Sequence, residues 1–158
     1  MPDLVSHAII GLLLCELLNI KPKSLVVLGA LLPDLLSKFE LLHLFFPFGD
    51  RLYWILMPLH TPIGLILATF LVIHFFNYNK KRSYILITLG WVSHILADWM
   101  INRHLYIGSF LWFPFSWKTS EIGIAWPEEF YLVLIPLVTI YLLIRFLKRI
   151  SDILPITK

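Results

Sequence analysis

Long runs of apolar residues, separated by short polar stretches, extend along most of the chain. They cover about residues 4–20, 24–46, 52–76, 83–101 and 130–147. A helix needs about 20 mostly apolar residues to cross the hydrocarbon core of a bilayer, and all these runs reach or nearly reach that length. Because the runs do not alternate with period two, the pattern disfavours a membrane β-barrel. We therefore expect an all-α fold, a multi-pass transmembrane bundle of about five helices.

Prolines interrupt the pattern in the second and third runs. Pro33 lacks a backbone N–H and disfavours helix in the residue before it, so we expect the second helix to be kinked or broken at Pro33. In the third run Pro58 and Pro62 bracket His60. Whether the second run spans the membrane or forms a re-entrant hairpin stays open at this point.

The long connection between the last two runs, residues 102–129, is rich in aromatic residues. It carries Trp112, Phe113, Phe115, Trp117 and Trp126 among glycine and proline. Aromatic rings gather at the headgroup level of a membrane, where an apolar body and a polar tip are both accommodated. We expect an aromatic interfacial loop that roofs a site below it.

The composition agrees with a membrane protein. Of 158 residues, 59% are hydrophobic and 15% are charged, with a mean hydropathy of +0.82. An ordinary soluble domain has roughly 25% charged residues. The length fits one integral membrane domain, residues 1–158. The net charge of +3 lies in clusters beside apolar runs, which indicates membrane topology and no nucleic-acid partner. One cysteine, Cys15, excludes a disulfide framework within the chain.

Lysine and arginine positions predict the orientation. Cytoplasmic loops carry an excess of these residues. Alternating five spans from an external N-terminus places inside Lys21, Lys23, Lys80, Lys81, Arg82, Arg145, Lys148, Arg149 and Lys158. The outside then holds only Lys38, Arg51, Arg103 and Lys118. We expect the N-terminus outside and the C-terminus in the cytoplasm.

A few ionisable residues interrupt the apolar runs: His7, Glu16, Asp34, His60, His74, His94 and Asp98. Such residues cost free energy inside a bilayer, so they pair, bind an ion or line a wet cavity. In the expected topology, His7, Asp34, His60, His94 and Asp98 share one depth near the outer side, with His104 just beyond. The topology rests on lysine and arginine positions alone, so the common depth of these histidines and aspartates is an independent observation. It predicts a metal site.

The spacing of His94 and Asp98 is the sharpest local signal. Residues four apart share one face of a helix, with Cβ atoms about 6 Å apart, so an imidazole nitrogen and a carboxylate oxygen can meet one cation or bridge two. Zinc binds both nitrogen and oxygen ligands, with metal–ligand distances of about 2.0–2.2 Å. Manganese or iron could use the same ligands. We expect one or two zinc ions.

Other interpretations of these residues stay open. A lone membrane histidine usually makes an interhelical hydrogen bond, and that reading is favoured for His74. His43 is expected at the interface, and Glu16 is expected to snorkel or pair with a lysine. Asp34 could cap a second helix that starts after the break. A metal or proton transporter and a non-enzymatic regulatory protein are the alternatives to an enzyme.

The sequence resembles the membrane-bound metal-dependent hydrolases, a family related to a LexA-regulated bacterial inner-membrane protein. The matching motifs are Ser6-His7-Ala8, residues 28–34 ending in Pro33-Asp34, His60-Thr61-Pro62, residues 93–98 from Ser93-His94 to Asp98, and residues 108–116. Family members often have His-Arg-x-x-Thr-His around the third motif, whereas this chain has Leu59-His60-Thr61, so His60 would stand for the second of those histidines and the first is lost. The resemblance implies a prokaryotic cell (inner) membrane location and hydrolase activity.

A more distant likeness is to zinc-dependent phospholipase C. Its ligand order is matched by His7, Asp34, His60, His94, Asp98 and His104, while its closing His-x-x-x-Glu is absent and only Glu128 or Glu129 could substitute. The resemblance implies hydrolysis of a phosphoester of a lipid or isoprenoid at the outer interface. Asp98 would act as metal carboxylate or bridging ligand, and Asp34 as ligand or base. Nothing in the sequence specifies an oligomeric state.

Overall fold

A computed structural model describes residues 4–37, 57–101 and 110–153, and their regular elements are helices. The α-helices are α1 (Leu4–Leu17), α2 (Lys23–Ser37), α4 (Pro62–Val72), α5 (Lys80–Ile101) and α6 (Phe130–Ile153). Short 3-10 helices are η2 (Met57–His60), η3 (Ile73–Phe75) and η4 (Pro127–Glu129). The expected all-α class is confirmed for these residues.

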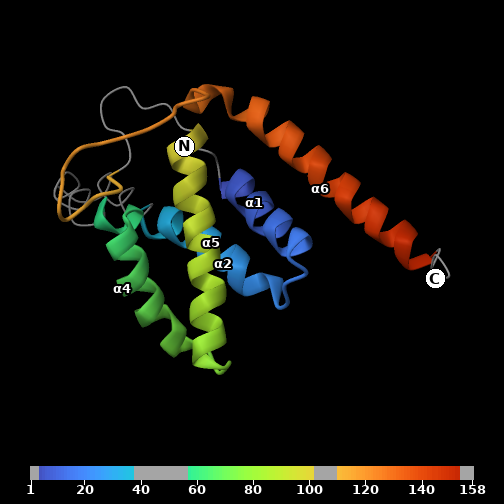
Figure 1. The fold of residues 1–158 in the computed structure, drawn as a ribbon, viewed down its shortest axis with the longest axis horizontal. Coiled ribbons are helices and arrows are strands. Elements are labelled where there is room, and N and C mark those ends of the chain that lie inside the picture. Colours follow the sequence, from blue (N-terminus) through green and yellow to red (C-terminus); the bar gives the residue numbers. More distant parts are fainter. Residues whose placement is uncertain (1–3, 38–56, 102–109, 154–158) are drawn as a thin grey trace, which may run out of the picture.

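Helix α5 is the centre of the fold (Figure 1). It packs against α2, α1 and α4, whereas α6 leans away and packs mainly on α1 (Figure 1). Of the described helices, α5 and the Tyr131–Ser151 part of α6 are long and apolar enough to cross a membrane. The apolar helices Leu4–Leu17 and Pro62–Phe75 are shorter. At 1.5 Å per residue, a helix of such length extends only about 21 Å, less than the roughly 30 Å hydrocarbon core.

Two glycines let the backbones of α2 and α5 touch. A Cβ on Gly90 of α5 would lie 1.9 Å from the Val26 carbonyl oxygen, and a Cβ on Gly29 of α2 would lie 2.1 Å from the Ile87 carbonyl oxygen. Both distances are far below van der Waals contact, so no side chain fits at either position. Small residues at such crossings are typical of membrane helix pairs. This crossing brings the second half of α2 beside the second half of α5.

The expected break at Pro33 is wrong. Helix α2 continues through Pro33 to Ser37, so Asp34 lies inside the helix and does not cap a new one. A proline lacks the backbone N–H that would bond to the preceding turn of the helix, and its ring also clashes with that turn. Here Pro33 is fully buried in the packed interior, and tertiary packing holds the helix together across the disturbance. Residues 38–56, where a re-entrant path would be decided, lie outside the described residues.

The described part of the third apolar run, from residue 57 on, begins with the 3-10 helix η2, which is followed by α4. Thr61 caps α4: its Oγ1 accepts a hydrogen bond from the Gly64 N–H at 3.2 Å and donates one to the Pro58 carbonyl at 2.5 Å. Pro62 occupies the first turn of α4, where its missing N–H carries no penalty. These contacts fix His60 in η2, directly before the helix.

The described part of the aromatic loop crosses the C-terminal end of α5. The N–H groups of residues 122, 124 and 125 donate to the Trp99, Met100 and Ile101 carbonyls at 2.9, 3.3 and 2.9 Å. The last carbonyls of a helix lack partners within it, so these bonds cap α5. Phe115 in this loop is 92% exposed, and the interfacial position of the loop stays a prediction.

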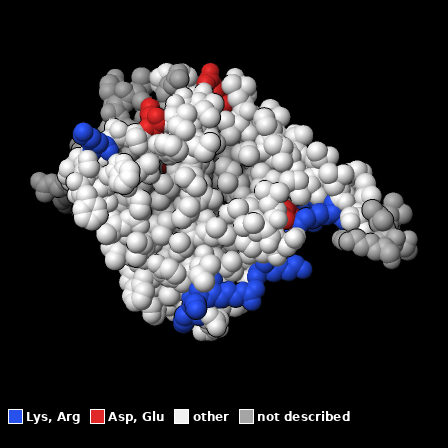
Figure 2. All heavy atoms as spheres, in the orientation of Figure 1, with Lys and Arg blue, Asp and Glu red and all other residues white. Residues whose placement is uncertain are grey.

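Charged side chains are segregated on the molecular surface. Figure 2 shows most lysine and arginine side chains along one edge of the visible face, acidic side chains near the opposite end, and a broad uncharged band between them. At the basic edge lies Glu16, which is 6% exposed. It pairs with Lys23 of α2, with Lys148 at 3.6 Å and with Arg145 at 3.9 Å, both of α6. The expected lysine pairing of Glu16 is confirmed, and it tethers α6 to α1.

We expect Glu16→Gln to loosen this tether. The variant keeps the side-chain shape but removes the charge that holds cations from two helices, so the thermal midpoint in detergent should fall by about 2–4 °C, the value of a loss of about 1 kcal/mol in a domain of this size. Hydrogen exchange should also rise at the C-terminal end of α6. Glu128→Gln, an exposed control, should change neither measurement. Equal behaviour of the two variants would refute the tether.

Candidate functional site

Histidines and aspartates from four elements meet beside the α2–α5 crossing. The cluster contains His7 of α1, Asp34 of α2, His60 of η2, and His94 and Asp98 of α5. The side chains of His7 and His94 are fully buried, those of Asp34 and Asp98 are 2% and 12% exposed, and that of His60 is 25% exposed. The structure thus brings together five of the six predicted ligands. The sixth, His104, lies outside the described residues.

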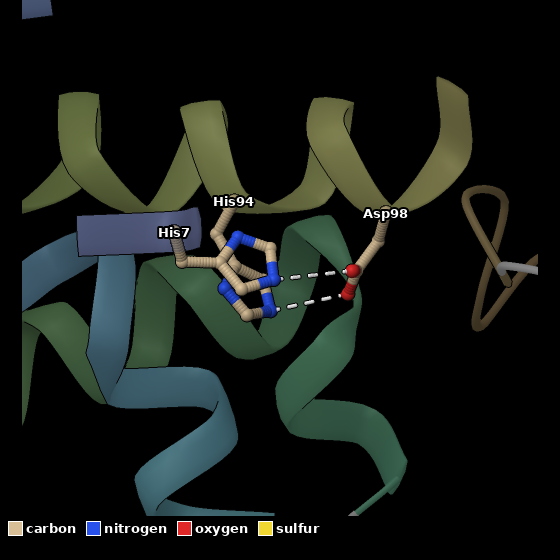
Figure 3. A group of neighbouring side chains, drawn as sticks. All are labelled: His7, His94 and Asp98. Atoms are coloured by element: carbon tan, nitrogen blue, oxygen red, sulfur yellow. Dashed lines mark ion pairs between the residues drawn. The ribbon is translucent and has the colours of Figure 1, made fainter. Parts of the chain in front are cut away.

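Each imidazole presents its Nε2 to a carboxylate. Around Asp98, His94 Nε2 lies 3.1 Å from Oδ2 and His7 Nε2 lies 3.3 Å from Oδ1 (Figure 3). Around Asp34, His60 Nε2 lies 3.6 Å and His94 Nε2 lies 3.8 Å from Oδ1, and His7 Nε2 lies 3.9 Å from Oδ2. The His7 and His94 rings stack with centroids 3.9 Å apart, so both Nε2 atoms face the same carboxylate (Figure 3).

These separations fit a shared cation better than direct hydrogen bonds. Nitrogen–oxygen hydrogen bonds are 2.7–3.2 Å long, and most of the distances above exceed this range. Two ligands of a tetrahedral zinc, each about 2.0–2.2 Å from the metal, lie roughly 3.3–3.6 Å apart. In the described structure, both ring nitrogens of His7 and the Nε2 atoms of His60 and His94 are buried without a hydrogen-bond partner. Buried polar atoms normally have partners, so the donor set fits a metal ion.

A backbone carbonyl fixes the tautomer of His94. Its Nδ1 lies 2.8 Å from the Ala30 carbonyl oxygen. A carbonyl can only accept, so Nδ1 donates and Nε2 of the neutral ring carries its lone pair toward Asp98. A lone pair facing a carboxylate is repulsive unless a proton or a metal ion lies between them. Metal-ligating histidines usually have this arrangement, with the second ring N–H donated to a carbonyl or carboxylate.

The remaining ionisable residues lie apart from the cluster. His74 is exposed, and its Nδ1 lies 2.8 Å from the carbonyl oxygen of Phe70, four residues earlier in the same helical segment, so the expected interhelical hydrogen bond is wrong. Glu129 accepts a hydrogen bond from the Trp126 N–H at 3.0 Å, and Glu128 is exposed. Neither glutamate belongs to the groups of described residues that could hold a metal ion.

Two parts of the site escaped the sequence analysis. The Ala30 carbonyl is a backbone group, and no residue type marks it as a partner of a histidine 64 positions later. The second part is an apolar core cluster of Trp91 and Ile95 of α5, the helix that carries His94, with Leu65 and Ala68 of α4, and Leu111 of the loop packs against it. Apolar residues predominate in each described α-helix, so their pattern does not reveal which ones line a site.

Comparison with known proteins identifies a membrane family. A model of the family described as YdjM inner membrane protein matches residues 1–153. Because this match covers nearly the whole chain, the protein belongs to the YdjM inner membrane protein family and is placed in the inner membrane. No curated protein and no solved structure matches the chain.

Proposed function

We propose that this member of the YdjM inner membrane protein family is a membrane-embedded, metal-dependent hydrolase. Its substrate would be a phosphoester of a lipid or isoprenoid at the outer membrane interface. The observation that carries the proposal is the cluster of three imidazoles and two carboxylates, drawn from four helical elements, at separations suited to shared cations. Zinc suits this mixture of nitrogen and oxygen ligands, and manganese or iron could replace it.

The charges of the cluster support a catalytic cation. Asp34 and Asp98 bring two carboxylates into a mostly buried site whose other ligating members are the imidazoles of His7, His60 and His94. A buried carboxylate without a compensating charge is strongly destabilising, so a divalent cation would stabilise the folded protein. When bound there, zinc would polarise a phosphoryl oxygen and lower the pKa of a water to about 7. Asp34 and Asp98 would hold and orient the reacting groups.

The position of the cluster supports an interfacial substrate. The cluster lies in the C-terminal half of α5, toward the end that the aromatic loop covers, whereas Lys80, Lys81 and Arg82 lie at the other end of the helix. If the basic edge faces the cytoplasm, the site lies near the outer surface, with the N-terminus outside and the C-terminus inside. A lipid headgroup sits at that depth. In this proposal α5 and α6 are complete spans within a multi-pass bundle of about five helices.

A transport function is less well supported by the contacts. A transporter needs polar groups along a path through the bilayer. Among the described residues, the buried carboxylate nearer the basic edge is Glu16, and its pairing with Lys23 and two α6 cations occupies it. Nothing in those contacts favours a second metal position there.

The proposal is tested by measuring the metal content and the hydrolytic activity of the same purified protein. Detergent-purified wild type, stripped with a chelator and reloaded with zinc, is expected to contain stoichiometric zinc and to cleave phosphoesters such as phospholipids and isoprenoid phosphates. His94→Ala should lose both properties, and His74→Ala, a histidine outside the cluster, should keep them. Wild type that retains no metal, or that is inactive on every phosphoester with metal supplied, would refute the proposal.

A further inference from the structure

The five donor residues form two groups that share one histidine. His7, His94 and Asp98 make one group, and Asp34, His60 and His94 make the other. Within each group the ligand atoms lie within 4.8 Å of one another. Two ligands of one zinc are at most about 4.4 Å apart, twice the metal–ligand distance. The 4.8 Å limit of each group is slightly larger than that, so a bound cation would draw the ligands of one group closer together, and His60 shares a group with neither His7 nor Asp98.

His94 can serve only one of the two groups. Its Nδ1 is used by the Ala30 carbonyl, so Nε2 offers a single lone pair. That atom is 3.1 Å from the Asp98 carboxylate and 3.8 Å from the Asp34 carboxylate. The shorter separation assigns His94 to the group with Asp98. The other group is then left with Asp34 and His60, an incomplete ligand set.

Asp34 presents its two oxygens to different partners. Oδ2 lies 3.9 Å from His7 Nε2, whereas Oδ1 lies 3.6 Å from His60 Nε2 and slightly farther, 3.8 Å, from His94 Nε2. By contrast, both oxygens of Asp98 face the pair of stacked histidines, His7 and His94. A carboxylate whose two oxygens point to different groups, like that of Asp34, can bridge two cations. A carboxylate whose two oxygens point to the same group, like that of Asp98, can bind one cation through both oxygens.

We infer that the centre holds two divalent cations in unequal positions, bridged by Asp34. The inner position is formed by His7, His94 and Asp98, and the outer position by His60, with one Asp34 oxygen reaching each. This inference rests on the proposed function and refines it: the sequence analysis left Asp98 as either metal carboxylate or bridging ligand, and the inference gives the bridging role to Asp34. Two-metal hydrolytic sites hold their ions about 3.5–4 Å apart.

The two positions differ in how open they are. The side chains that form the inner position are 0–12% exposed, whereas the side chain of His60 is 25% exposed. With only two protein ligands, the outer position has room for phosphate oxygens. Two divalent cations would also exceed the two carboxylate charges, and an anionic phosphoester would balance the excess. The outer position is therefore the one that contacts the substrate.

Zinc stoichiometry tests the inference separately from the proposed function. Equilibrium dialysis of the purified full chain against zinc, followed by elemental analysis, is expected to give two equivalents in wild type. His60→Ala should retain one equivalent, and His74→Ala should retain two. X-ray absorption of the loaded wild type should show a zinc neighbour at about 3.5–4 Å, and that neighbour should be missing in His60→Ala.

Each result decides between the possibilities. One equivalent in wild type would overturn the two-cation centre and leave the hydrolase proposal standing, whereas no bound zinc would refute both. Two equivalents in His60→Ala would overturn the outer position. If His60→Ala fails to fold, the wild-type measurements decide: two equivalents with a zinc–zinc neighbour support the inference, and two equivalents without one overturn the Asp34 bridge.

Discussion

Asp98→Asn is expected to lower the affinity for zinc by at least about 100-fold and to reduce phosphoester hydrolysis to background. Residues that merely support a metal ligand cost 10–100-fold when they are replaced, so loss of a charged ligand should cost more. The amide keeps the size of the carboxylate but lacks the negative charge that would stabilise a cation held together with His7 and His94, whose Nε2 atoms face it at 3.3 and 3.1 Å. Zinc content by elemental analysis and hydrolysis of a phosphoester are the measurements.

Thermal unfolding separates loss of the metal from loss of the fold. A ligand that binds only the folded state raises stability by about 2.7 kcal/mol at 100 times its dissociation constant. Zinc should therefore raise the thermal midpoint of wild type and of His74→Ala, and it should leave that of Asp98→Asn nearly unchanged. Without metal, Asp98→Asn should be folded, because it removes a buried charge. A variant that binds zinc like wild type would contradict a ligand role for Asp98.

The parts of the site that follow from local periodicity could be predicted from the sequence. The four-residue spacing of His94 and Asp98 places them on one helix face, and both are buried on that face of α5. The shared depth of Asp34 and His60 followed from lysine and arginine placement. The structure places these residues near one another, although His60 ends the short 3-10 helix η2 and does not lie in an α-helix.

Features that depend on contacts between distant backbones could not be predicted. Proline rules are local and predicted a break at Pro33, but packing against α5 keeps α2 helical to Ser37. The division of the donors into two groups depends on which Asp34 oxygen faces which histidine, and spacing along the chain does not specify that. Likewise, no local pattern identifies Gly29 and Gly90 as partners in one crossing.

Gly90→Ala is expected to destabilise the protein and to abolish zinc binding, although Gly90 contacts no ligand side chain. The new Cβ would lie 1.9 Å from the Val26 carbonyl oxygen and 2.7 Å from the Ala30 backbone nitrogen. Both obstacles are backbone atoms, so the two helices must move apart. Overpacking of a core typically costs about 1–3 kcal/mol, and we expect the upper end, even though alanine favours a helix over glycine by about 1 kcal/mol.

Separation of the helices should disrupt the centre through Ala30. Its carbonyl accepts from His94 Nδ1 at 2.8 Å, and a shift of 1 Å, about the smallest that relieves the overlap, would break that bond. Gly11→Ala is the matched control, because its Cβ would meet the Ala30 Cβ at 3.3 Å and the Val27 Cα at 3.4 Å, a contact that slight adjustment relieves. Unfolding in detergent and zinc stoichiometry are measured on both variants. If Gly90→Ala matches Gly11→Ala in stability and zinc content, the close α2–α5 crossing does not position the site.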